Sequence, residues 1–140
     1  MSKLKLHIVS QERKLLETEV EQVSAPTSEG VITILPHHIP LFTKLQLGEL
    51  LYTEQGVEHT VIVTQGFLTI DQHNTVTVMV DSASLDREIS EQKAQEAVEA
   101  AKHTMSVTTD RRELILAEAS LRRALLEIRV AQRTKRANVV

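Results

Sequence analysis

The sequence has no cysteine and no tryptophan, and its only aromatic residues are one tyrosine and two phenylalanines. The absence of cysteine excludes disulfides, thiolate metal sites and cysteine nucleophiles. With so few aromatic rings, the core has to be built from Leu, Ile, Val and Ala. Glycine and proline are also unevenly placed, since neither occurs between Ser84 and Val140.

Long hydrophobic runs and a strong excess of charge are missing as well. No segment approaches the roughly 20 apolar residues of a membrane span, and the N-terminus lacks the apolar stretch of a signal peptide. The net charge of −3 gives the chain as a whole no general attraction to nucleic acid. We therefore expect a cytoplasmic protein that reaches a membrane only through a partner.

Motifs of the common nucleotide-binding and hydrolytic sites are absent. The sequence contains no GxxxxGK[ST], GxGxxG, GxSxG or HExxH. His37 and His38 are the only adjacent histidines, and neighbours in an extended segment point in opposite directions, so they are poorly placed to share one metal ion. Pro36 and Pro40 flank the pair, which favours a turn. No catalytic residue, metal site or cofactor is predicted, and a stand-alone hydrolase is not supported.

The first half of the chain has the periodicity of β-strands. Apolar Leu4, Leu6 and Ile8 alternate with polar residues, and so do the valines of segment 74–80. Segments 31–35 and 59–70 are rich in β-branched residues. Turn residues cluster at four places, namely 25–30, 36–40, 54–56 and 71–74. No helical pattern separates the strands, which makes parallel crossovers improbable and favours an antiparallel β-sandwich or barrel.

The second half has the composition of helices. Ser84 or Asp86 is expected to cap a first helix, the segment 106–110 to interrupt it, and Asp110 with Glu113 to begin a second one. The expected seam between them consists of Leu114, Ala117, Leu121, Ala124, Ile128 and Ala131 on the second helix and Leu85, Ile89, Ala97, Ala101 and Met105 on the first. The predicted fold is thus α+β, with an N-terminal antiparallel β-sandwich (1–84) followed by an antiparallel two-helix hairpin (85–140).

Positive charge is concentrated in the hairpin. Residues 87–140 contain 11 Lys and Arg against 8 Asp and Glu, a balance of +3. One helical face carries Arg122, Arg129, Arg133 and Arg136. This face is either simply solvated or a steering surface for an acidic protein. RNA is the weaker alternative, because no aromatic residues are interleaved for stacking on bases.

Two motifs in the first half resemble the epsilon subunit of bacterial F-type ATP synthases. The first is "GVITILPHHIPLFTKLQLGEL" (30–50), in which Pro36, His38, Pro40 and Leu41 fall on the family pattern. The second is "VTQGFLTIDQHNTVTVMVDSA" (63–83), where matches include Gly66, Phe67, Asn74, Val76, Thr77, Val78 and Asp81. The resemblance extends over the whole chain, including the two-helix end.

This resemblance implies a non-catalytic subunit of the rotating central stalk in a proton-translocating ATP synthase, at the cytoplasmic face of the membrane. The sandwich would anchor on the gamma subunit and the c-ring through Pro36, His38, Pro40 and Leu41. The hairpin would extend to the catalytic alpha and beta subunits and inhibit ATP hydrolysis through Arg122, Arg123 and Arg129. The alternative is a small β-sandwich module whose basic hairpin binds RNA or an unrelated acidic protein.

Two departures from the family pattern bear on these expectations. His37 occupies a position that is usually glycine, which suggests a backbone with positive φ. The nucleotide signature Ile/Leu-Asp-x-x-Arg-Ala retains Leu85 and Asp86, but Ile89 and Ser90 replace Arg-Ala. Because the lost arginine is a phosphate-compatible cation, we expect weak or absent ATP binding, unless Arg87 substitutes for it. Asp86 is the only retained polar residue of the signature.

Overall fold

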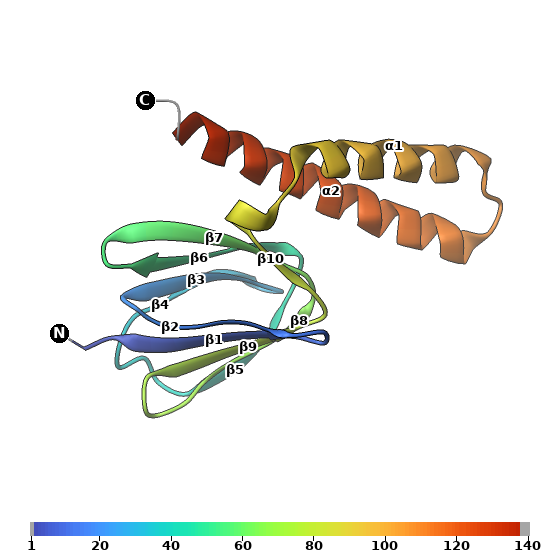
Figure 1. Cartoon of the computed structure of the whole chain (residues 1–140). Coiled ribbons are helices and arrows are strands. Elements are labelled where there is room, and N and C mark those ends of the chain that lie inside the picture. The colour runs from blue at the N-terminus through green and yellow to red at the C-terminus, as the bar shows by residue number, and fades with distance from the viewer. Residues whose placement is uncertain (1, 138–140) are drawn as a thin grey trace. The chain divides into compact units, whose positions relative to one another are not determined.

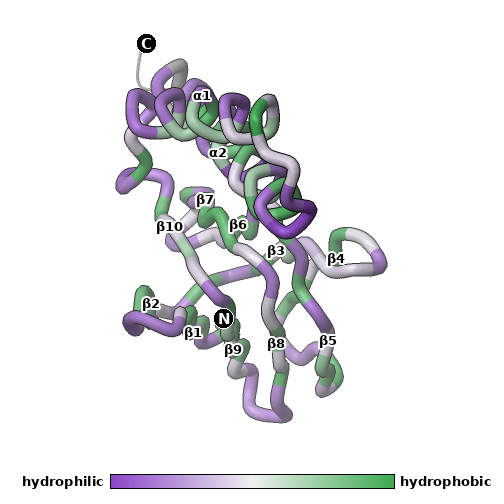
Figure 2. Tube along the Cα trace, turned by 90° about the vertical axis from the view of Figure 1, so that its right-hand side faces the viewer, coloured by the Kyte–Doolittle hydropathy of each residue, from purple (hydrophilic) through white to green (hydrophobic). Residues whose placement is uncertain are grey.

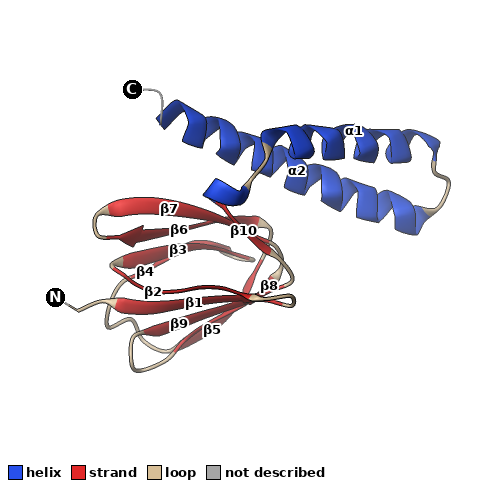
Figure 3. Cartoon of the chain, viewed as in Figure 1, coloured by secondary structure: helices blue, strands red, loops and turns tan. Residues whose placement is uncertain are grey.

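A computed structural model describes residues 2–137 of the chain, with the backbone alone for 136 and 137. The chain forms two compact units, of which the first ends at Leu85 and the second begins at Asp86 (Figure 1). The boundary expected from the sequence lay one residue earlier. The first unit consists of strands and the second of helices (Figure 3).

The first unit is a β-sandwich, as predicted. Its strands are β1 (Leu4–Ser10), β2 (Lys14–Val20), β3 (Gln22–Thr27), β4 (Gly30–Ile34), β5 (Leu41–Leu45), β6 (Gly48–Glu54), β7 (Val57–Val63), β8 (Gly66–Ile70), β9 (Thr75–Val80) and β10 (Ala83–Leu85). They pair in the order β10-β7-β6-β3-β5-β8-β9-β1-β2, with β4 on β3. β3 and β5 share only the pair Thr27–Leu45, so the sheet folds over there into two layers (Figure 1).

The core lies between these layers and follows the predicted alternation. Leu4, Leu6 and Ile8 of β1 are completely buried, and Val76 and Val78 of β9 join them. Each such side chain contributes roughly 1.5–3 kcal/mol through burial. Almost all the buried side chains of this unit are aliphatic, as the shortage of aromatic residues requires.

One pairing contradicts the expectation that parallel strands are absent. β1 and β9 are parallel neighbours, with Lys5 opposite Thr75 and Val9 opposite Met79. The absence of a helical pattern excludes only a direct crossover between consecutive strands. Here the parallel pair joins strands that are far apart in the sequence, and the intervening strands bring the chain round without a helix.

Pro26 lies inside β3 rather than in a turn, so the turn predicted at 25–30 was placed too widely. The residue has no N–H to donate, yet it is fully within the ladder with β4, opposite Val31. On its other side, pairing with β6 ends at Ser24 and pairing with β5 begins at Thr27. Pro26 thus occupies the change of partner strand, where a missing donor is tolerated.

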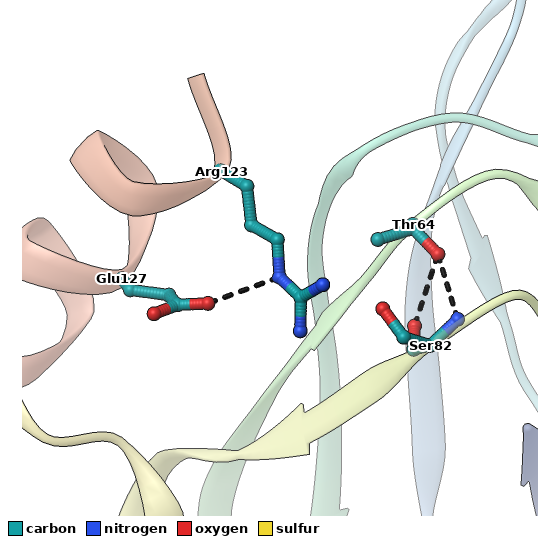
Figure 4. Close-up of polar contacts among 4 residues, drawn as sticks. All are labelled: Thr64, Ser82, Arg123 and Glu127. Carbon is teal, nitrogen blue, oxygen red and sulfur yellow. Dashed lines mark hydrogen bonds and ion pairs between the residues drawn. The ribbon is translucent and has the colours of Figure 1, made fainter. Parts of the chain in front are cut away.

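Side-chain hydrogen bonds join two of the connections between strands. Segment 59–70 is divided between β7 and β8 at Thr64, whose hydroxyl donates to the carbonyl oxygen of Ser82 (3.1 Å) and accepts from the Ser82 N–H (2.8 Å) (Figure 4). These bonds tie the β7–β8 connection to the β9–β10 connection.

Two carboxylates hold the tips of hairpins. The Glu21 carboxylate accepts the N–H groups of Gly56 (2.8 Å) and Gln55 (3.0 Å), both of which have positive φ. Asp71 Oδ1 accepts the N–H groups of His73 (2.7 Å) and Thr75 (3.0 Å). The bond from Gly56 lowers the pKa of Glu21, and the bond from Thr75, followed by that from His73, lowers the pKa of Asp71.

These lowered pKa values predict an acid-sensitive stability. Carboxylates with a depressed folded-state pKa add stability above their ordinary values of about 4, and this is lost as the pH falls through the folded pKa. We expect urea unfolding midpoints of the wild type to fall more between pH 6 and pH 3 than those of the Glu21→Gln/Asp71→Asn variant. Glu58→Gln, at an exposed site on β7, controls for removal of a negative charge. Equal acid-induced losses would contradict the assignment.

The second unit comprises the 3-10 helix η1 (Asp86–Glu88) and the helices α1 (Glu91–Val107) and α2 (Arg111–Ala137). The predicted caps of the first helix, Ser84 and Asp86, are wrong. Ser84 belongs to β10 and pairs with Ile62 of β7. The N-cap of α1 is Ser90, whose side chain accepts the N–H of Lys93 (3.3 Å). β10 prolongs the sandwich because it adds a strand to β7 and buries Leu85.

The loop between the helices is shorter than predicted, because α1 continues through Val107. The second helix begins where expected, but Asp110 accepts the N–H of Arg112 (2.9 Å) instead of that of Glu113. Glu113 accepts from the hydroxyl of Thr108 (2.5 Å), and that hydroxyl accepts the Asp110 N–H (3.1 Å). Thr108 therefore links the two helix ends.

The hairpin buries few and mostly small side chains. Green and purple segments alternate along both helices in Figure 2. The buried residues are Ala94, Val98 and Ala101 on α1 and Ala117, Ala124 and Val130 on α2. Of the alanines in the predicted α2 seam, Ala117 and Ala124 are buried, whereas Ala131 is half-buried. Ala97 of the predicted α1 seam is exposed. On α1 the predicted Ala101 is buried, but Leu85 and Ile89 precede the helix, and the buried Ala94 and Val98 were not predicted. A bond between Gln132 and Glu91 (3.2 Å) joins the start of α1 to the end of α2.

Candidate functional site

The segment with two histidines forms a tight turn. The carbonyl oxygen of Leu35 accepts the N–H of His38 (3.2 Å), which closes a four-residue β-turn. Pro36 occupies its second position and His37, with φ of 70°, its third. Proline followed by a residue of positive φ is typical of a type II turn, whose third position favours glycine. The structure thus shows His37 in the backbone conformation that the family's glycine would adopt.

The two imidazoles have different partners. His37 Nε2 hydrogen-bonds with Ser2 Oγ (3.0 Å), whereas His38 Nδ1 donates to the carbonyl oxygen of Ile39 (2.7 Å). Because each ring is engaged separately, the pair does not converge on one point. Among the described residues, no group of three His, Asp or Glu side chains could hold a metal ion.

The turn and the two residues that follow it, which together we call the turn 35–40, expose apolar side chains. Leu35 and Ile39 are 53% and 74% exposed, and neither was singled out from the sequence. Pro40 is also exposed, while Pro36 and His38 are half-buried. Leu41, by contrast, begins β5 and packs against the core. Of the residues predicted for this surface, Leu41 is therefore one that also contributes to the core.

A second apolar group lies on the outer face of β5, β8 and β9. Phe42 is 64% exposed, and its ring stacks on Phe67 with 5.2 Å between centroids. Met79 lies opposite Phe67 on the next strand and is also exposed. Two of the chain's three aromatic residues therefore lie on the surface. Contiguous exposed apolar side chains of this kind mark an interaction site. We use the name apolar surface for the two groups together, that is, Leu35 and Ile39 at the turn and Phe42, Phe67 and Met79 on the strands.

The three arginines predicted for a partner contact do not share one face of α2. Arg122 and Arg129 are exposed and seven residues apart, which places them on the same side of the helix. Arg123 lies about 100° away, and its Nε donates to Glu127 Oε1 (3.0 Å) in an ion pair one turn along the helix (Figure 4). The side chain of Arg136 is outside the described residues.

Asp86 acts locally at the start of the second unit. Its Oδ1 accepts the N–H of Arg87 (2.7 Å), and its carbonyl oxygen accepts the N–H of Ile89 (3.4 Å). Ser90, which departs from the nucleotide signature, is the N-cap of α1. In the part of the chain that the structure describes, no helix combines the length and the apolar character needed to cross a membrane.

Comparisons with known proteins agree on one family. Residues 3–86 match the family described as ATP synthase, Delta/Epsilon chain, beta-sandwich domain. The ATP synthase epsilon chain of Herpetosiphon aurantiacus is 40% identical over 129 residues, which cover 92% of this chain and 94% of that protein. The ATP synthase epsilon chain of Dehalococcoides mccartyi is 41% identical over 137 residues, 97% of each chain.

Solved structures support the same fold. A chain in the Euglena gracilis mitochondrial ATP synthase structure of OSCP/F1/c-ring in rotational state 1 superposes with a TM-score of 0.74 at 22% identity, covering 96% of this chain and 82% of the other. A chain in the central stalk/c-ring structure of Tetrahymena thermophila mitochondrial ATP synthase gives 0.64 at 14% identity, covering 93% and 97%.

Proposed function

The chain belongs to the ATP synthase epsilon chain family, and from this premise we propose that it is a non-catalytic central-stalk subunit that couples rotation of the c-ring to the catalytic head through the gamma subunit. It would act at the cytoplasmic face of the membrane, as a peripheral part of a proton-translocating complex. The alternative of an RNA-binding module loses its support, because the family match covers the sandwich and the relatives extend over the hairpin.

The observation that supports docking through the sandwich is the apolar surface. It combines Leu35 and Ile39, whose carbonyl oxygens accept hydrogen bonds from His38, with the stacked rings of Phe42 and Phe67 on the paired strands β5 and β8. Exposed aromatic side chains carry much of the binding energy in protein interfaces. Gamma and the c-ring are the partners that the family assigns to this half of the chain, and the predicted contacts Pro36, His38 and Pro40 lie in the same turn.

Substitution of Phe42 tests this docking. We expect Phe42→Ser to weaken binding of the full-length chain to a synthase complex depleted of this subunit by roughly 30-fold, the effect of about 2 kcal/mol at an aromatic hot spot. The chain should still fold, because Phe42 is mostly exposed. Binding is measured as the dissociation constant of the soluble chain for the complex immobilised on a surface. Folding is checked by thermal unfolding of the chain.

Val57→Ser provides the matched control, since Val57 is 56% exposed on β7, outside the apolar surface. That variant should bind like the wild type. Unchanged binding of Phe42→Ser would remove this face from the proposed interface, and failure of the wild type to bind would overturn the proposed function itself.

For the hairpin we propose an inhibitory role, in which it extends toward the catalytic alpha and beta subunits and limits ATP hydrolysis. Two features support it. The hairpin buries mainly alanine, so little apolar burial opposes its rearrangement. Arg122 and Arg129 offer an exposed basic face for acidic segments of a partner. Arg123 would contribute only after release from Glu127.

A further inference from the structure

The turn that carries Leu35 and Ile39 is held from a distant part of the chain. The backbone N–H of His37 donates to the side-chain oxygen Oδ1 of Asn74, at 2.7 Å. Asn74 follows β8 in the connection to β9, so this bond crosses from one loop to another. It meets the turn at its third position, where φ is positive and the backbone is most constrained.

Asn74 is itself firmly fixed. Its φ of 61° is tolerated by asparagine better than by most residues, and its carbonyl oxygen accepts the N–H of Lys5 at the start of β1 (2.8 Å). The same β8–β9 connection is closed by Asp71, whose carboxylate accepts the N–H groups of His73 and Thr75. The Asn74 side chain thus projects from a loop that other hydrogen bonds already hold.

Apolar packing does little to hold the turn, because Leu35 and Ile39 are both exposed and Pro40 is exposed as well. Its backbone is held by the Leu35–His38 bond, the Asn74–His37 bond and the bond from His38 Nδ1 to the carbonyl oxygen of Ile39, and of these only the second comes from outside the segment. The imidazole of His37 adds a bond to Ser2, from a residue near the N-terminus. Removal of the Asn74 side chain would leave the turn with the two bonds internal to the segment and this exposed side-chain contact.

We propose that Asn74 is a positioning residue for docking: its side-chain oxygen presets the turn 35–40 so that Leu35 and Ile39 meet the partner without further ordering. This inference rests on the proposed function, because it assigns a role within that interface. A surface segment that is ordered before binding does not lose conformational entropy on binding, and affinity rises accordingly.

A pair of substitutions at one position isolates the hydrogen bond. Asn74→Asp keeps an acceptor oxygen at the same place, and Asn74→Gly keeps the positive φ but removes the acceptor. We expect Asn74→Gly to bind the subunit-depleted complex about 5- to 10-fold more weakly than the wild type, and Asn74→Asp to bind within about twofold. Thermal unfolding should change little between the two variants, so that affinity and stability separate.

His37→Gly tests which part of His37 matters. It keeps the backbone N–H and the permitted φ but removes the imidazole, so its affinity should stay close to that of the wild type. Hydrogen exchange of the His37 amide, followed by NMR on the free full-length chain, should be slow in the wild type and in Asn74→Asp and fast in Asn74→Gly.

The outcomes separate the two proposals. Equal binding of Asn74→Gly and wild type, or fast exchange of the His37 amide in the wild type, would overturn the positioning role. If the wild type itself does not bind the complex, the proposed function fails, and the exchange measurement still decides whether Asn74 holds the turn. If Asn74→Gly loses global stability, the wild-type measurement decides the matter. Slow exchange of the His37 amide in the wild type would then support the Asn74–His37 bond, and fast exchange would overturn it.

Discussion

Gly66→Ala destabilises the sandwich by about 3 kcal/mol or more, because the new methyl group has no space. A Cβ at this position would lie 2.1 Å from the carbonyl oxygen of Met79 and 2.7 Å from the Cα of Val80. Both atoms belong to the backbone of β9, which pairs with β8 in a register that sets Gly66 opposite Val80. Relief would therefore require the two strands to separate at the start of β8.

Urea unfolding of the full-length chain measures this loss, and Gly56→Ala is its control. Gly56 also lies in a hairpin of the sandwich, but a Cβ there meets nothing within 4 Å, and only its φ of +78° is unfavourable. We expect that control to lose about 1 kcal/mol through backbone strain. If Gly66→Ala loses no more than Gly56→Ala, the close approach of β8 and β9 is not as described.

We expect removal of the hairpin to raise ATP hydrolysis by the assembled complex, because the proposed inhibitory element is then missing. Regulatory coupling of about 1–3 kcal/mol corresponds to an increase of roughly 5-fold or more. The chain is ended after Leu85, because Leu85 pairs with Val61 in β10 and belongs to the sandwich core. Steady-state hydrolysis is compared between complexes reconstituted with the full and the shortened chain, at equal subunit occupancy.

Charge reversal on α2 examines the same effect without a truncation. Arg122→Glu/Arg129→Glu should also raise hydrolysis, since both side chains are exposed on one face. Arg111→Glu/Arg112→Glu changes the same charge at the exposed start of the helix and should have a smaller effect. Unchanged hydrolysis after both the truncation and the Arg122/Arg129 reversal would remove the inhibitory role while leaving the stalk function intact.

The fold could be predicted where the pattern is local. Alternation at Leu4, Leu6 and Ile8 fixes the buried face of a strand, and the helical composition after Leu85 fixes the hairpin. The parallel pairing of β1 with β9 could not be predicted in this way, because it depends on how the intervening strands bend. The N-cap of α1 was placed too early for a related reason. Residues 83–85 pair with β7 as the strand β10, so the helix cannot begin at Ser84.

The candidate site was predicted in part. The prolines indicate the turn, and the positive φ was expected because His37 occupies a position that is usually glycine in the family. Leu35, Ile39 and Phe42 were missed, because an apolar residue beside a strand is ordinarily interpreted as core. Their exposure depends on which face of β5 and of the turn meets the opposite layer. The small number of aromatic residues could have drawn attention to Phe42 and Phe67. Two of the three aromatic side chains lie on the surface, where packing in the core does not explain them.

The parallel pairing of β1 and β9 also constrains how the protein is made. β1 is among the first segments to leave the ribosome, yet its partner from Thr75 onward emerges only after most of the sandwich. Until then β1 has only β2 beside it, and an isolated two-stranded hairpin is marginal in water. Completion of the sandwich is therefore a late, non-local step of the kind that slows folding. A nascent chain that stalls before β9 presents the unpaired edge of β1, a surface prone to association with other unfinished chains.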